Sequence, residues 1–93
     1  MAEAVFDWDD ANVRHLARHG VTPQEFEQAA SADPVLLDYE NVDAEDRWVG
    51  LGATNGLRVL KLAFTIREGR IRAITAFDAS KKDAREYWKR KGN

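Results

Sequence analysis

The chain has 93 residues, no cysteine and a formal net charge of −2. This length suits one domain with a single modest core and is too short for two independent cores. The lack of cysteine excludes a disulfide-stabilised scaffold, and no apolar run approaches the roughly twenty residues that a membrane-spanning helix needs. We therefore expect a single domain over residues 1–93 that is soluble, has no membrane partner and resides in a bacterial type of cytoplasm.

The charges are strongly segregated along the chain. Residues 1–46 contain all but four of the 16 acidic residues, but only Arg14 and Arg18 among the 14 basic ones. Residues 47–66 contain no acid at all. This pattern predicts either a basic face for an anion such as RNA or for an acidic partner, or two halves that neutralise each other across the fold. The sequence leaves both interpretations open.

The first third of the chain predicts a short strand followed by two helices. Residues 5–8 are apolar and aromatic, and the acid Asp9 is well placed to cap a helix over residues 10–19, which Gly20 would terminate. Thr22 and Glu25 have the spacing of a capping box, with a proline at the first helical position between them. A second helix is therefore expected over residues 23–31.

From residue 35 onward the pattern changes to the alternation typical of strands. Four β-rich runs cover residues 35–39, 47–53, 57–66 and 70–77, and Asn55-Gly56 gives the strongest hairpin signal between them. In the third run, apolar residues such as Leu62 share one face, whereas Lys61 and Thr65 share the other. That alternation predicts one core face and one face with polar groups for a ligand.

Ser80 caps a final predicted helix over residues 81–91, which Tyr87 and Trp88 would pack onto the rest of the domain. The complete order is an N-terminal strand, two helices, an antiparallel β-meander of about four strands and a C-terminal helix. This order predicts an α+β fold.

With these elements in place, the chain resembles the BrnT family of small toxin ribonucleases over nearly its whole length. The matching positions are Phe6, Trp8, Asp9, Asn12, Arg18, His19, Gly20, Val21, Asp33-Pro34, Asp46, Arg47, Gly52, Arg72, Ile74, Thr75, Ala76, Ala79, Asp83 and Tyr87. The resemblance implies a small RelE-like domain, the toxin of a type II toxin–antitoxin pair, which cleaves mRNA as a metal-independent endoribonuclease without a cofactor. It also implies a BrnA-like antitoxin as partner, with DNA contacted only indirectly through that antitoxin.

Metal-independent RNA cleavage defines which side chains to look for. The 2′-hydroxyl attacks the adjacent phosphate, so the site must accept one proton, donate another and stabilise the extra negative charge of the phosphorane. Guanidinium and ammonium groups stabilise that charge, and aromatic rings stack on bases. The predicted catalytic residues are His19, Arg47, Lys61, Arg72 and Tyr87, and the predicted RNA-binding residues are Trp48, Arg67 and Arg70.

Several of these residues also have a purely structural interpretation. His15 and His19 have the spacing of a metal-binding pair, but Leu16 occupies the position of the glutamate in zinc proteases and no third ligand follows, so no metal site is expected. His19 is also suited to stabilise the end of its helix, where a cation is favoured. The basic strand residues form either a phosphate-binding surface or a solvated sheet face, and we favour the first because residues 47–66 lack acids.

One position departs from the resemblance. Where most members of the family have an arginine, this chain has Phe77, and the acidic Asp78 follows. Loss of that guanidinium removes positive charge from the region where charge develops during cleavage. A second hypothesis is therefore a catalytically silent BrnT-like module that only binds an antitoxin-like partner.

Overall fold

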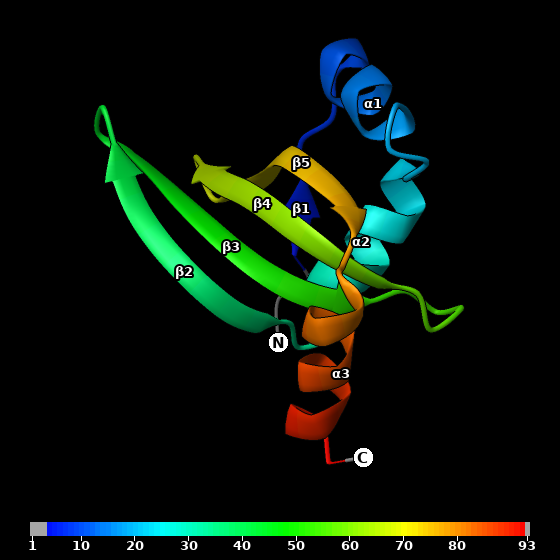
Figure 1. The fold of residues 1–93 in the computed structure, drawn as a ribbon. Helices are drawn as coiled ribbons and strands as arrows, with labels where there is room; N and C mark the ends of the chain where they lie inside the picture. Colours follow the sequence, from blue (N-terminus) through cyan, green and yellow to red (C-terminus); the bar gives the residue numbers. More distant parts are fainter. Residues whose placement is uncertain (1–3, 93) are drawn as a thin grey trace.

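A computed structural model describes residues 4–92, which form one five-stranded sheet and three helices (Figure 1). The elements in chain order are β1 (Val5–Phe6), α1 (Asp10–Ala17), α2 (Pro23–Ser31), β2 (Val35–Val42), β3 (Glu45–Ala53), β4 (Val59–Arg67), β5 (Arg70–Asp78) and α3 (Lys81–Arg90). Strands β2 to β5 form an antiparallel meander, which confirms the α+β class and the predicted order of elements. No helix within residues 4–92 is long and apolar enough to span a membrane.

The first strand is shorter than predicted and changes the character of the sheet. β1 contains only Val5 and Phe6, and it pairs in parallel with the start of β5. The backbone N–H of Asp7 extends this pairing by donating to the carbonyl oxygen of Ile71 at 2.9 Å. The sheet is therefore mixed, with strand order β1-β5-β4-β3-β2, because the N-terminal segment joins the edge of the meander.

The predicted helix starts are confirmed by their hydrogen bonds. The Asp9 carboxylate accepts the backbone N–H of Asn12 at 2.8 Å and caps α1. Thr22 and Glu25 form the reciprocal capping box at the start of α2. α1 ends earlier than predicted, and the chain after it turns through Gly20, whose φ of +70° is the left-handed conformation expected of a glycine there.

The two faces of the sheet carry separate cores. Helices α1 and α2 cover the first face, where the buried residues are Leu16, Val21, Phe26, Ala29, Leu60, Leu62, Phe64, Ala73 and Ala76. Helix α3 packs on one end of the second face, where the buried residues are Leu51, Ala53, Val59 and Tyr87. The rest of the second face has no helix over it (Figure 1). We call this region the open face and define it by Arg47, Val49, Lys61, Ala63, Thr65, Arg72, Thr75 and Phe77.

The β2–β3 hairpin contains a strained turn that gives a stability prediction. Asp43 and Ala44 both have positive φ, at 52° and 64°, between the paired residues Val42 and Glu45. Such a two-residue turn favours glycine at its second position, because a side chain there clashes with the backbone. We expect Ala44→Gly to raise the free energy of unfolding by about 1 kcal/mol in urea denaturation.

The control is the reverse substitution, glycine to alanine, in the β4–β5 hairpin. Gly69 has φ of +76°, and a Cβ added there would meet no atom within 4 Å. Gly69→Ala therefore changes only the backbone preference, and it should lower stability by about 1 kcal/mol. Equal stability of both variants and the wild-type protein would show that these turns relax without strain.

Candidate functional site

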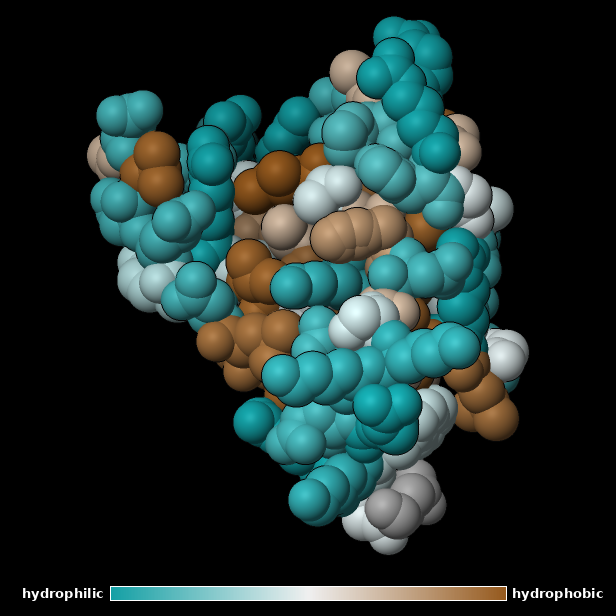
Figure 2. Space-filling view, in the orientation of Figure 1, coloured by the Kyte–Doolittle hydropathy of each residue, from teal (hydrophilic) through white to brown (hydrophobic). Residues whose placement is uncertain are grey.

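The open face places charged and polar residues in rows across three strands. Arg47 of β3 lies beside Thr65 of β4, and Thr65 lies beside Arg72 of β5. Two residues along β4, the row through Ala63 and Thr75 follows, and the next row pairs Lys61 with Phe77. Figure 2 shows this side of the molecule, with apolar atoms exposed in a hollow between hydrophilic groups.

Helix α1 adds two histidines to the β5 side of the open face. The Nε2 atom of His15 lies 3.1 Å from the hydroxyl oxygen of Thr75. The rings of His15 and His19 are 5.4 Å apart, and the ring of His19 is 6.0 Å from that of Phe77. The structure therefore brings the predicted His19 to the same face as Lys61, and it adds His15.

His15 was not among the predicted catalytic residues, although the sequence contained a signal for it. Residues four apart lie on the same side of a helix, so His15 and His19 share one flank of α1. The same spacing is also that of a metal-binding pair. Among residues 4–92, no group of three or more His, Asp or Glu side chains is arranged to hold a metal ion.

Arg72 reaches the open face but is held by acids from the start of the chain. Its two terminal nitrogens donate to Asp7 and Asp9, each at 2.9 Å, and its side chain is 23% exposed. The backbone N–H of Asn12 and the Arg72 guanidinium lower the pKa of Asp9. Arg72 therefore fastens the segment between β1 and α1 to β5, and much of its charge is already neutralised.

Arg47 and Lys61 are the more available cations of the open face. The Nε of Arg47 lies 3.4 Å from Glu45, and the Nζ of Lys61 lies 4.0 Å from Asp83 of α3. Their side chains remain 40% and 38% exposed. Exposed ion pairs of this length contribute little to stability, so these contacts are easily exchanged for a phosphate.

The other predicted RNA-binding arginines lie near the β4–β5 turn. The Nη2 of Arg67 donates to Glu45 at 2.8 Å, and this contact is the main cause of the lowered pKa of Glu45. Arg70 is exposed, pairs across the strands with Arg67, and has no ion pair among the described residues. Both arginines form the next row along the sheet after that of Arg47, Thr65 and Arg72.

The structure does not bring Trp48 to the open face. Successive residues of a strand point to opposite faces, so Trp48 lies opposite Arg47. Its ring stacks on Phe64 with the centroids 6.0 Å apart and lies 5.3 Å from the ring of Tyr39. Trp48 therefore packs against the edge of the first core.

Tyr87 is likewise in a packing position. It is 3% exposed, belongs to the core under α3 and contacts the ring of Trp88 in a T-shaped arrangement. A phenol this deeply buried cannot reach RNA unless α3 moves. The confirmed part of the prediction is that Tyr87 and Trp88 pack the last helix onto the sheet.

Thr65 has an unusual hydroxyl. It is 4% exposed, and its Oγ1 is a buried side-chain atom without a hydrogen-bond partner among the described residues. An unpaired buried hydroxyl costs about 1 to 3 kcal/mol, so such atoms call for an explanation. In the sheet, Thr65 lies between Arg47 and Arg72.

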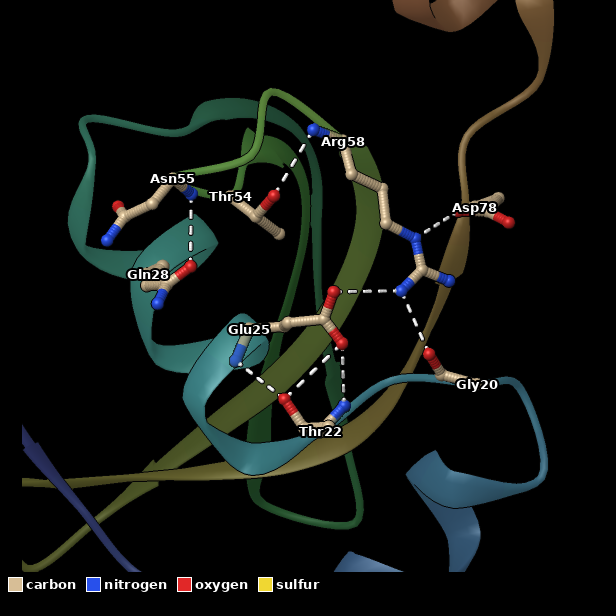
Figure 3. Close-up of polar contacts among 8 residues, drawn as sticks. All are labelled: Gly20, Thr22, Glu25, Gln28, Thr54, Asn55, Arg58 and Asp78. Atoms are coloured by element: carbon tan, nitrogen blue, oxygen red, sulfur yellow. Dashed lines mark hydrogen bonds and ion pairs between the residues drawn. The ribbon is translucent and has the colours of Figure 1, made fainter.

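One arginine, Arg58, links the turn after α1 to the end of β5 (Figure 3). The Nη1 of Arg58 donates to the carbonyl oxygen of Gly20 at 2.8 Å, and its Nε donates to Asp78 at 2.6 Å. Gly20 follows His19 in the chain, and Asp78 follows Phe77. The same guanidinium also pairs with Glu25 at 3.0 Å, which ties α2 into the network.

These ion pairs also bear on the two interpretations of the segregated charges. Arg58, Arg72 and Lys91 all bind acids from the first 46 residues, so much of the charge is neutralised across the fold. Among residues 4–92, other cations have no ion pair, including Arg70, Lys81 and Lys82. Neutralisation across the fold therefore holds for part of the charge, and binding of an anion by the remaining cations stays a prediction.

Comparison with known proteins identifies the family. A family model described as a ribonuclease toxin, BrnT, of a type II toxin–antitoxin system matches residues 8–83. This segment includes both histidines and the whole sheet except β1. No curated protein matches the chain. The chain therefore belongs to the BrnT family of ribonuclease toxins of type II toxin–antitoxin systems.

Proposed function

We propose that the protein is a metal-independent endoribonuclease that cleaves mRNA, and that a BrnA-like antitoxin binds and neutralises it. The observation that carries the proposal is that His15 contacts Thr75 and His19 contacts Phe77, the cross-strand neighbour of Lys61, along the open face. Two imidazoles and an ammonium can supply the base, the acid and the positive charge that this reaction needs when no metal takes part.

The reaction divides between proton transfer and charge stabilisation. One imidazole acts as the base and accepts the proton of the 2′-hydroxyl as that oxygen attacks the phosphorus. A second group acts as the acid and protonates the leaving 5′-oxygen. Histidine suits both tasks because it changes its charge near neutral pH. Lys61, beside Phe77 in the sheet, supplies positive charge for the phosphorane oxygens.

The remaining cations bind the RNA strand away from the reacting phosphate. Arg47 lies two rows from Lys61, and Arg67 lies three rows from it, toward the other end of the open face. Guanidinium groups grip two phosphate oxygens at once, which makes them suited to hold the backbone in register. Arg72 lies in the same row as Arg47. Its ion pairs with Asp7 and Asp9 chiefly connect β5 to the segment between β1 and α1.

Cleavage of labelled RNA by the purified protein in the presence of a chelator tests this function. We expect cleavage by the wild-type protein and at least about a hundredfold slower cleavage by Lys61→Gln, because a single stabilising group of this type contributes about that much. Lys89→Gln is the matched control, since Lys89 is exposed in the last turn of α3, whereas the contact of α3 with Lys61 is made by Asp83 near the start of the helix.

The alternative hypothesis gives a different result in the same assay. A folded wild-type protein that leaves RNA intact with and without chelator, yet binds an antitoxin, would be a silent binding module. Cleavage that the chelator abolishes would contradict the metal-independent mechanism and keep the ribonuclease activity. Equal cleavage rates for Lys61→Gln and the wild-type protein would show that Lys61 takes no part in catalysis.

A further inference from the structure

Phe77 is an aromatic residue on the open face that neither core uses. The two apolar clusters formed by the described residues include its neighbours Ala76 and Ala79 but not Phe77. Its side chain is half-buried, and it lies between Lys61 of β4 and His19 at the end of α1. Packing of the domain therefore does not explain why an aromatic ring stands at this position.

The ring of Phe77 is accessible to a planar ligand. Its contact with His19 is T-shaped, with 6.0 Å between centroids and 78° between ring planes. A T-shaped contact occupies at most one face of the Phe77 ring. The Phe77 side chain is only half-buried, so part of its ring remains exposed.

The surroundings hold this ring in place before any ligand arrives. Asp78, the residue after Phe77, accepts a hydrogen bond from Arg58. The same arginine donates to the carbonyl oxygen of Gly20, the residue after His19 (Figure 3). A side chain whose position is already fixed loses little freedom when a ligand binds. Phe77 therefore has the properties of a preorganised platform.

We propose that Phe77 stacks on one nucleobase of the RNA and thereby places the neighbouring phosphate between Lys61 and His19. This inference rests on the proposed ribonuclease function. Aromatic side chains bind unpaired bases by stacking, and such stacking tolerates any base because every base has a π-face. Phe77 thus contributes to RNA affinity by contact with a base, whereas an arginine at this position would contribute by contact with a phosphate.

Binding to a strand that cannot be cleaved tests stacking separately from catalysis. The probe is a short single-stranded 2′-O-methyl RNA, compared with a strand of equal length that lacks the bases. We expect Phe77→Leu to weaken binding of the first strand about tenfold and to leave binding of the base-free strand unchanged. Phe77→Trp should bind the first strand at least as well as the wild-type protein does.

Phe6→Leu is the matched control, because Phe6 packs at the edge of the first core on the opposite side of the sheet. It should bind both strands like the wild-type protein. Equal binding by Phe77→Leu and the wild-type protein would overturn the stacking role and leave the ribonuclease proposal standing. A wild-type protein that binds neither strand would overturn both proposals. Weakened binding of both strands by Phe77→Leu would also overturn stacking, because the loss would not depend on the bases.

Discussion

Replacing Gly52 by alanine should unfold the protein or leave it close to unfolding. A Cβ at Gly52 would lie 2.1 Å from the carbonyl oxygen of Ala29 and 2.7 Å from its carbonyl carbon. Both atoms belong to the backbone of α2, so no side-chain rotation relieves the clash. The helix must move away from the sheet, and with it Phe26, which is fully buried.

The expected loss of stability is at least about 3 kcal/mol, because overpacking alone costs about 1 to 3 kcal/mol and a disrupted phenylalanine contact adds to it. Small domains have a total stability of about 5 to 15 kcal/mol. Gly56→Ala is the control, since a Cβ there would lie 3.8 Å from the nearest atom, the Thr54 hydroxyl oxygen. Urea denaturation at the same midpoint for Gly52→Ala and the wild-type protein would show that α2 does not pack this closely.

Replacing His19 by alanine should lower the rate of RNA cleavage by about a hundredfold to ten-thousandfold, the usual contribution of a positioned acid or base. His19 is exposed and its ring contacts the rings of His15 and Phe77, so the fold should tolerate the change.

Arg14→Ala is the control for this measurement, because Arg14 is an exposed residue of the same helix and alanine favours helix formation. It should cleave RNA like the wild-type protein. A His19→Ala variant with full activity would assign the proton transfers to other groups, His15 first among them.

The sequence by itself determined the local elements of this fold. The capping box between Thr22 and Glu25 and the cap at Asp9 depend on hydrogen bonds within three residues, which a sequence displays directly. The alternation through Leu60, Leu62 and Phe64 likewise follows from strand geometry and correctly assigned the core face. The family resemblance could also be recognised from the sequence, because its matching positions are spread over most of the chain.

The sequence also located turns more reliably than it specified their conformation. Asn55 and Gly56 do turn the β3–β4 hairpin, but the left-handed residue is Leu57, with φ of +66°. The N–H of Leu57 donates to Thr54, which makes the loop one residue longer than a two-residue turn. The register of the paired strands decided the length and conformation of this loop, and register depends on packing across the whole sheet.

Only the tertiary structure decided which of the candidate residues share a site. His19 and Phe77, the cross-strand neighbour of Lys61, are far apart in the chain and lie in contact because α1 packs along β5 and Arg58 anchors the turn after His19. The same packing buried Tyr87 under α3 and placed Trp48 on the opposite face from Arg47. Contacts between distant segments depend on how helices dock onto the sheet, and a sequence pattern with a period of two or four residues contains no information about that docking.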